Sequence, residues 1–168
     1  MAQYTKKLEQ LYVAYFNRSA DPAGLAYWES IVASQGGNIS AVSNSFSQSE
    51  EYKNTYAGMD NATIVNQVYR NLFGRESEIA GRNYWAQNLD AKNLTMDNVV
   101  TTISESARGT DLIAFNNKVT AATSLTTTLD TSAAASSYAG ESALALARAY
   151  LSQVTDAESL IRAQKNDF

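Results

Sequence analysis

The chain has 168 residues, a formal net charge of −4 and a sequence pI near 4.8. This mild acidity argues against a nucleic-acid binder, which needs a basic surface, and against a protein that binds anionic membranes. It contains neither Cys nor His, which excludes zinc and haem sites built on these residues, thiol nucleophiles and Ser-His-Asp triads. Apolar residues make up 45% and charged residues 18% of the chain, as in a globular domain, and no run of about 18 apolar residues predicts a membrane span.

The sequence of residues 1–57 predicts three helices. The first has apolar residues three and four positions apart, at Leu8, Leu11, Tyr12, Tyr15 and Phe16. After a polar turn at residues 17–21, Asp21 and Pro22 suit the N-cap and first position of a second helix. This helix is predicted to end at Gly36-Gly37 and to bury Tyr27, Trp28, Ile31 and Val32. The third helix, from about Ile39 to Ser47, has an apolar face at Val42 and Phe46.

The same order of helices is predicted again 57 residues further on. Its first helix carries Val65, Val68, Tyr69, Leu72 and Phe73. A turn at residues 74–78 leads to a helix that is predicted to bury Tyr84, Trp85 and Leu89 and to end near Asn93. The third helix runs from about Met96 to Ser106, with Val99 and Ile103 on its apolar face.

After residue 108 the sequence predicts a long helix, a loop and two shorter helices. A longer seventh helix has its apolar face at Leu112, Phe115, Val119, Ala122 and Leu125. Residues 124–139 are rich in Ser, Thr and Ala and are predicted to form a loop, although the alanines leave a partly helical state open. A helix resumes at Glu141, and Thr155-Asp156 caps a short last helix with Leu160 and Ile161.

The constant spacing of 57 residues indicates a duplicated unit. Without a gap, residues 11–30 read LYVAYFNRSADPAGLAYWES and residues 68–87 read VYRNLFGRESEIAGRNYWAQ. Both tryptophans of the protein lie at matching positions. The sequence therefore predicts an all-α fold of two duplicated three-helix units, residues 1–57 and 58–108, with a C-terminal helical extension at 109–168, together forming one compact unit.

The repeated motif is R-x-x-(D/E)-x-A-G-x-x-Y-W. In a structural interpretation, the acid caps the second helix, Arg bonds to the acid or to a carbonyl, Gly permits close helix packing, and Tyr and Trp anchor the helix in the core. In a functional interpretation, aromatic and polar groups near the turns bind a ligand. The candidate binding residues are then Asn17, Arg18, Asp21, Tyr27, Trp28, Arg75, Glu78 and Trp85. Asn17, Arg18 and Asp21 are expected to be the best exposed polar group. Tyr52, Tyr56 and Tyr138 are candidates for exposed tyrosines, whereas in the structural interpretation most tyrosines at helical spacing face the core.

The motif YFNRSADPAGLAYW, followed by a loop and FSQSEEY, closely resembles the domain of unknown function 4214. The resemblance covers two copies over residues 8–107, and the later segments NNKVTAAT and AYLSQVTDAESLIRA look like the tail that often follows such modules. The second copy departs from the pattern with Gly74, Glu78 and Ile79 where the first has Asn17, Asp21 and Pro22. Because Glu78 is still an acid, its capping role is expected to survive.

The resemblance implies a helical module of bacterial exported proteins of the S-layer and RTX type, similar also to the phycobilisome linker domain. Such proteins leave the cell by type I secretion. This agrees with an N-terminus whose apolar stretch is interrupted by Glu9, Gln10, Asn17 and Arg18 and is not predicted to be a cleaved signal. The implied location is the bacterial cell surface, where the chain would anchor or assemble a larger protein. The expected partners are surface polysaccharide or lipopolysaccharide, neighbouring copies of the same protein, or both.

Three alternatives remain at this point. A protein–protein scaffold or lattice module is nearly as well supported, whereas a phycobilisome-linker scaffold fits less well because such linkers tend to be basic. Catalysis is not expected, because the adjacent acids Glu50-Glu51 and Glu76/Glu78 are typical of solvated helix ends. No cofactor is predicted; the sequence contains no EF-hand loop and no G-G-x-G-x-D repeat, although calcium could bridge this segment to its neighbours.

Overall fold

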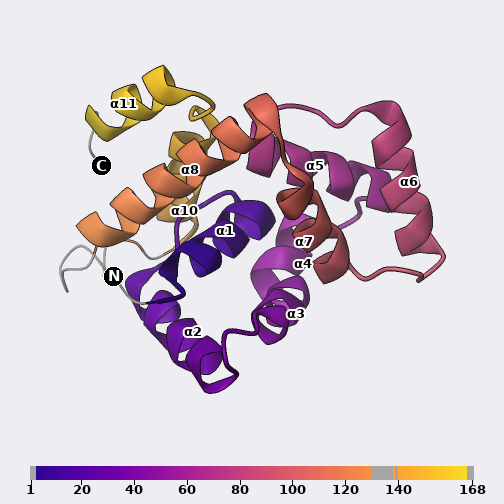
Figure 1. Cartoon of the computed structure of the whole chain (residues 1–168), viewed down its shortest axis with the longest axis horizontal. Coiled ribbons are helices and arrows are strands. Elements are labelled where there is room, and N and C mark those ends of the chain that lie inside the picture. Colours follow the sequence, from indigo (N-terminus) through magenta and orange to yellow (C-terminus); the bar gives the residue numbers. More distant parts are fainter. Residues whose placement is uncertain (1–2, 130–137, 139, 166–168) are drawn as a thin grey trace.

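The computed structural model of the chain describes residues 3–129, 138 and 140–165. Its helices are joined by short turns. Within these residues there are ten helices and no strand, so the all-α prediction is confirmed (Figure 1). The helices are α1 (Thr5–Phe16), α2 (Pro22–Ser34), α3 (Ser40–Gln48), α4 (Glu50–Thr55), α5 (Asn61–Phe73), α6 (Ile79–Asp90), α7 (Met96–Ser106), α8 (Gly109–Thr128), α10 (Glu141–Ser152) and α11 (Ala157–Lys165). None of the described helices is both long and apolar enough to cross a bilayer.

Helix α1 lies at the centre of the molecule and packs against α2, α3, α4, α5, α7 and α8 (Figure 1). Its predicted apolar face is buried throughout, at Leu8, Leu11, Tyr12, Tyr15 and Phe16. A helix with many neighbours buries more than one stripe, and Val13 and Ala14 are buried as well, while Lys6 and Lys7 in its first turn stay exposed. One apolar cluster joins this helix to side chains of α5, α7, α8 and α10.

Helices at matching positions in the two halves pack against each other, α1 against α5 and α3 against α7. At the α1–α5 crossing the Asn71 amide donates a hydrogen bond of 3.0 Å to the carbonyl oxygen of Ala14, the residue 57 positions earlier. The predicted boundaries after residues 57 and 108 fall between helices, while the apolar cluster takes side chains from all three segments. The interpretation as a duplicated unit stays a prediction.

Two helices differ from the sequence-based expectations. Residues 50–55 form α4, which was not predicted, and its N-cap Ser49 accepts a hydrogen bond from the Tyr52 N–H. Residues 124–128 continue α8 instead of starting a loop. The Ser/Thr composition is compatible with a helix here because hydroxyls such as those of Thr123 and Thr127 donate back to carbonyls four residues earlier. The rest of the predicted loop, 130–137 and 139, lies outside the described residues.

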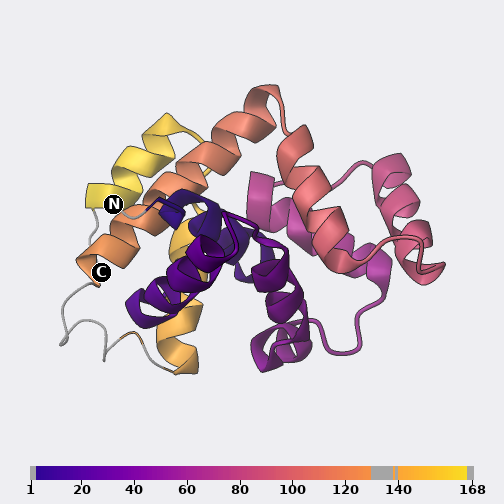
Figure 2. The same cartoon turned by 60° about the horizontal axis from the view of Figure 1, so that its bottom comes forward.

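The C-terminal helices α10 and α11 lie against the rest of the molecule on the side of α8 (Figure 2). The residues that end α1 and α5 lie next to this C-terminal segment. The amide of Asn17, the C-cap of α1, donates to Ser152 Oγ at 2.8 Å. A Cβ at Gly74, the C-cap of α5, would lie only 2.5 Å from Cγ2 of Thr155. As predicted, Asp156 caps α11, since it accepts from the Ser159 N–H at 2.8 Å.

Candidate functional site

An aromatic pair with one exposed ring lies on α2. The rings of Tyr27 and Trp28 meet edge to face, with centroids 4.8 Å apart and an interplanar angle of 71°. Trp28 is half-buried and packs against Phe46 of the core, with centroids 5.8 Å apart. Tyr27 is 58% exposed. The tryptophan therefore fixes the helix to the core while the tyrosine ring faces solvent beside it.

Helix α6 carries the matching pair. The Tyr84 and Trp85 centroids are 4.9 Å apart at an interplanar angle of 73°. Trp85 packs against the core and Tyr84 is 57% exposed. In both views α2 and α6 lie on separate sides of the molecule, one packed against α1 and the other against α5 (Figures 1 and 2). The two tyrosines thus form two separate exposed positions with the same local geometry.

These positions correct the prediction that the second helices bury Tyr27 and Tyr84. Consecutive residues on a helix point about 100° apart, so only one member of each Tyr-Trp dipeptide can face the core squarely, and in both helices it is the tryptophan. The tyrosines that were expected to be exposed are not: Tyr56 and Tyr138 are buried and Tyr52 is half-buried. The Tyr56 hydroxyl donates to the carbonyl oxygen of Tyr15 at 2.9 Å.

The residues around the two exposed tyrosines differ between their helices: they are small or neutral on α2, whereas α6 also carries the exposed Ile79, the half-buried Arg82 and the exposed Asp90. On α2 the exposed neighbours are Ala23, Ala26, Ser30 and Ser34. The single charged residue of α2, Glu29, is half-buried and accepts a hydrogen bond from the Tyr4 N–H. On α6 the exposed neighbours include Asn83 and Gln87. A flat ring with a hydroxyl, flanked by hydroxyl and amide groups, can contact apolar faces and hydroxyl groups of a neutral ligand.

Arg18, expected to be exposed with Asn17 and Asp21, is buried at the centre of an ion-pair network, and Asn17 and Asp21 are half-buried. Its guanidinium bonds both carboxylate oxygens of Glu51, at 2.8 and 2.7 Å, and the carbonyl oxygen of Ser19 at 2.9 Å. Arg148 of α10 also bonds Glu51, at 2.9 Å. Burial acts to raise the Glu51 pKa, but Arg18 and Arg148 outweigh it, so this pKa is lowered.

Arg75, at the matching position, forms the same kind of pair. Its guanidinium bonds both carboxylate oxygens of Asp111 at 2.7 Å and the carbonyl oxygen of Glu76 at 2.8 Å. It also pairs with Glu78 at 2.9 Å. Hydrogen bonding to Asp111 raises the Arg75 pKa above its ordinary value. Each motif arginine thus binds an acid in the first turn of the helix that follows the third helix, α4 or α8.

The acids of the motif differ in their capping. Asp21 caps α2, accepting from the Gly24 N–H at 2.7 Å, as predicted. Glu78 occupies the N-cap of α6 but makes no side-chain cap hydrogen bond, so the expected conservation of this role was wrong. The longer glutamate side chain reaches Arg75 instead. The motif therefore does not build the same turn twice.

The other acids that the sequence offers for catalysis are held by basic side chains. Glu50 pairs with Lys53 at 3.3 Å, and Glu76 pairs with Arg70. Hydrogen bonding to Arg70 lowers the pKa of Glu76, whereas a general acid at neutral pH needs a raised pKa. Within residues 3–129, 138 and 140–165, no three acidic side chains gather in a way that could hold a metal ion.

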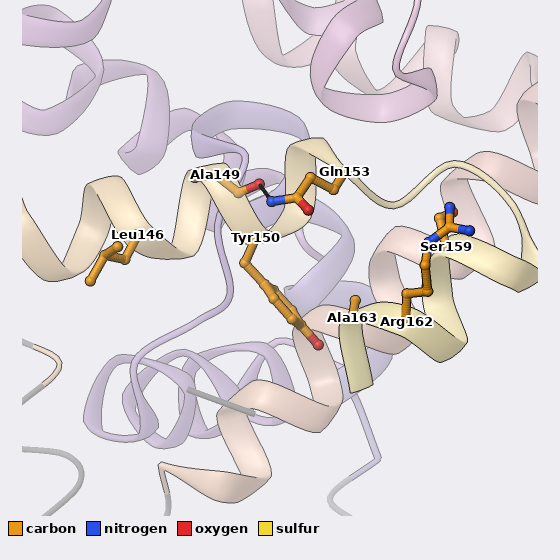
Figure 3. A pocket seen from close by; sticks show the side chains of 7 residues that line it. All are labelled: Leu146, Ala149, Tyr150, Gln153, Ser159, Arg162 and Ala163. Carbon is orange, nitrogen blue, oxygen red and sulfur yellow. Dashed lines mark hydrogen bonds between the residues drawn. The ribbon is translucent and has the colours of Figure 1, made fainter. Parts of the chain in front are cut away.

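An open hollow of about 750 Å³ lies between α10 and α11, away from all the predicted binding residues. Figure 3 shows the Tyr150 ring extending from α10 toward Ala163 of α11, and Gln153 turned back to the Ala149 carbonyl. The lining residues are Leu146, Ala149, Tyr150, Gln153, Ser159, Arg162 and Ala163. Ile161, also on α11, is 51% exposed, whereas Leu160 packs against the core.

Sequence reasoning missed Asp111 and Arg148 and did not connect Glu51 to Arg18. Glu51 belongs to the segment FSQSEEY, so a search for an acid near the end of each unit could have found it. In the second half the position that matches Glu51 is Arg108. The acid that binds Arg75 is Asp111, which follows Arg108 after nearly one helical turn. No sequence spacing relates Arg148 to either motif.

Comparison with known proteins gives one match. Residues 43–111 match the model of a family described as Domain of unknown function (DUF4214). This stretch runs from α3 to the first turn of α8 and contains Arg75, Glu78, Tyr84 and Trp85, but not the first motif at residues 18–28. No curated protein and no solved structure matches the chain. The match supports the resemblance over this part of the chain, and its description assigns no activity.

Proposed function

We propose that the chain is a non-enzymatic helical module that attaches a larger bacterial cell-surface protein to surface polysaccharide, the sugar part of lipopolysaccharide included. The observation that carries this proposal is the matching exposure of Tyr27 and Tyr84, 58% and 57%. Burying a large aromatic ring stabilises a folded protein. Two such rings left in solvent at matching positions, each held by a core tryptophan, are therefore best explained by a ligand.

The separation of the two tyrosines favours a polymer over a small molecule. They lie on α2 and α6, on separate sides of the molecule (Figure 1), so one short ligand does not cover both. A repeating polysaccharide presents the same sugar many times and can occupy both positions at once. Two weak contacts on one polymer then act together with a much higher effective affinity.

The neutral character of the α2 face supports sugar over an anionic or cationic partner. Ala23, Ala26, Ser30 and Ser34 present no charge around Tyr27. A protein neighbour in a surface lattice, the alternative function, would use the same rings but would make the purified chain self-associate. The S-layer and RTX-type context that the sequence resemblance implies accommodates both functions.

Binding to polymers of defined composition tests this proposal. Smooth lipopolysaccharide, its released O-polysaccharide and rough lipopolysaccharide are titrated with the wild-type chain and with Tyr27→Ala, Tyr84→Ala and the double variant. We expect each single substitution to weaken binding to the smooth and released polymers by about 10-fold, through loss of one of two coupled contacts, and the double variant to lose binding.

The matched control is Leu146→Ala, which removes another exposed apolar side chain, 60% exposed, from a helix without the motif. It should bind like the wild type, and circular dichroism should show unchanged helicity in all variants. A double variant that binds the released polysaccharide as tightly as the wild type would refute the proposal. Self-association of the wild type in light scattering, abolished in the double variant and without sugar binding, would establish the lattice alternative.

A further inference from the structure

Glu9 is a fully buried acid that the proposed binding function does not use. It lies on α1, is 0% exposed, and faces α8 and the turn between α1 and α2. Its Oε2 accepts a hydrogen bond of 3.1 Å from the Ala20 N–H. Its Oε1 lies 2.5 Å from Thr126 Oγ1 of α8. One carboxyl group therefore connects three separate segments of the fold.

The hydrogens at this junction favour a protonated carboxyl group. Thr126 Oγ1 also lies 3.0 Å from the carbonyl oxygen of Ala20, and a hydroxyl has a single hydrogen to donate. If Glu9 is ionised, Thr126 must choose between the carboxylate and that carbonyl. If Glu9 is protonated, it donates to Thr126, which donates to Ala20, and all three hydrogen bonds form at once.

Among the residues that the structure describes, the charged groups around the junction do not supply a counterion for an ionised Glu9. Arg18, on the adjoining turn, has its guanidinium bonded to Glu51 and to the Ser19 carbonyl. Asp21, on the same turn, is an acid and disfavours a second negative charge. An unpaired buried carboxylate is strongly disfavoured relative to the neutral acid.

Two buried tyrosines complete the surroundings, Tyr12 on α1 and Tyr138 before α10. Burial raises the pKa of each phenol, so both stay neutral near pH 7. Burial also raises the pKa of Glu9 to about 7, against the opposing effects of Thr126, Ala20 and Arg18.

We propose that Glu9 is a proton-binding site that couples pH near neutrality to the packing of α8 against α1 and the Ser19–Ala20 turn. This inference is independent of polysaccharide binding. Ser19 of the turn also accepts a hydrogen bond from the Tyr138 hydroxyl, 3.1 Å from its carbonyl oxygen. The turn that Glu9 holds is thus also bound to Tyr138, which lies just before α10. Loss of the Glu9 proton therefore disturbs the contact between this turn and the segment that leads into α10.

The direction of the pH effect follows from the number of bound protons. An unfolded chain releases the Glu9 proton near the ordinary value of 4.5, whereas the folded chain holds it to about 7. Between these values the folded state binds more protons, so its stability is full below pH 4.5 and falls as the pH rises through 7.

The test compares Glu9→Gln with Glu50→Gln, an exposed glutamate whose side chain is 82% accessible. Urea denaturation is measured from pH 5 to 8.5. Over this range the folding equilibrium constant of the wild type should fall on the order of 100-fold, because folded Glu9 loses its proton. The Glu9→Gln variant keeps the shape of the neutral acid and should not show this fall, while the Glu50→Gln variant should show it in full. A fall of the same size in Glu9→Gln would overturn the proposal.

A second measurement does not depend on the folding of a variant. The ¹³C resonance of the Glu9 side-chain carboxyl in the wild-type chain should titrate near pH 7, and amide exchange at Thr126 should speed up over the same range relative to amides of α6. Titration of Glu9 near 4.5, or exchange at Thr126 that does not follow the titration, would refute the coupling.

Discussion

Arg18 and Arg75 occupy matching positions in the sequence and make matching bonds, but their surroundings differ. The Arg18 side chain is 8% exposed and that of Arg75 38%. Each lies over two aromatic rings of the preceding helix, Arg18 over Tyr12 at 5.1 Å and Arg75 over Tyr69 at 5.5 Å. Ion pairs contribute more when solvent and salt do not screen them.

This difference predicts unequal effects of one substitution. Arg18→Lys cannot hold both oxygens of Glu51 and the Ser19 carbonyl at once, so it should lower the free energy of unfolding by about 2–3 kcal/mol. Arg75→Lys, in a more exposed pair, should lower it by less than about 1 kcal/mol. Urea denaturation at neutral pH measures both, and losses of equal size would show that burial does not distinguish the two pairs.

The sequence identified these arginines as important residues but not what they bind. Spacing along the chain suggested the acid three residues later, and Arg75 does contact Glu78. The strong bidentate partners lie 33 and 36 residues away. Partners at that separation depend on how α4 and α8 pack, which periodicity does not report.

At the scale of the helix, the repeated glycine shows how one motif position serves two different environments. A Cβ at Gly24 would lie 2.7 Å from the Tyr12 hydroxyl and under 3 Å from both carboxylate oxygens of Asp21. At Gly81 the nearest atom is the Tyr69 hydroxyl, at 3.9 Å. The close approach that the motif predicts is therefore present in α2 and absent in α6.

Alanine at these two positions should act in opposite directions. Gly81→Ala should raise the free energy of unfolding by about 0.5–1 kcal/mol, because alanine favours the helix and its methyl group meets the Tyr69 hydroxyl only at an ordinary contact distance. Gly24→Ala should lower it, because the methyl group displaces the Tyr12 hydroxyl and the Asp21 cap. Thermal and urea denaturation of both variants decide this, and stabilisation by Gly24→Ala would contradict the steric explanation.

The starts of α2 and α11 were correctly predicted. Asp21, Pro22 and Asp156 begin helices where expected, because an N-cap satisfies backbone N–H groups within the same turn. The exposed tyrosines were mispredicted because neighbouring Tyr and Trp are both large and apolar. Which of the two faces the core depends on where α1 and α5 lie, not on α2 or α6 alone.

For the whole molecule, the C-terminal helices depend on contacts with both halves. Lys118 of α8 is fully buried and donates to the Leu151 carbonyl near the end of α10 at 2.7 Å, and burial lowers its pKa to about 8. Asn17 bonds α10, and Gly74 leaves room for Thr155 before α11. The change from Asn17 to Gly74 between the matching positions thus reflects two different contacts with the same C-terminal segment.

The contact at Gly74 predicts a substitution effect that a second substitution partly reverses. Gly74 has φ +69 and would place a Cβ 2.5 Å from Thr155 Cγ2, whereas Gly58 has φ +74 and open space. Gly58→Ala should lower the free energy of unfolding by about 1–2 kcal/mol through backbone strain alone. Gly74→Ala should lower it by more, because the added methyl group also meets Thr155. Adding Thr155→Ser, which removes Cγ2, should recover part of the loss in Gly74→Ala and none in Gly58→Ala, as measured in a double-mutant cycle.

By itself, the sequence determined the helical class, the positions of most helices, the caps at Asp21 and Asp156 and the 57-residue spacing, because these follow from periodicity and hydrogen bonding within a few residues. Only the tertiary structure decided that Tyr27 and Tyr84 face solvent, that Arg18 and Arg75 bind Glu51 and Asp111, and that Glu9 is buried. Burial and long-range pairing depend on which helices pack on which face. For a helix such as α1, which packs against six other helices, local patterning cannot distinguish an exposed acid from a buried one.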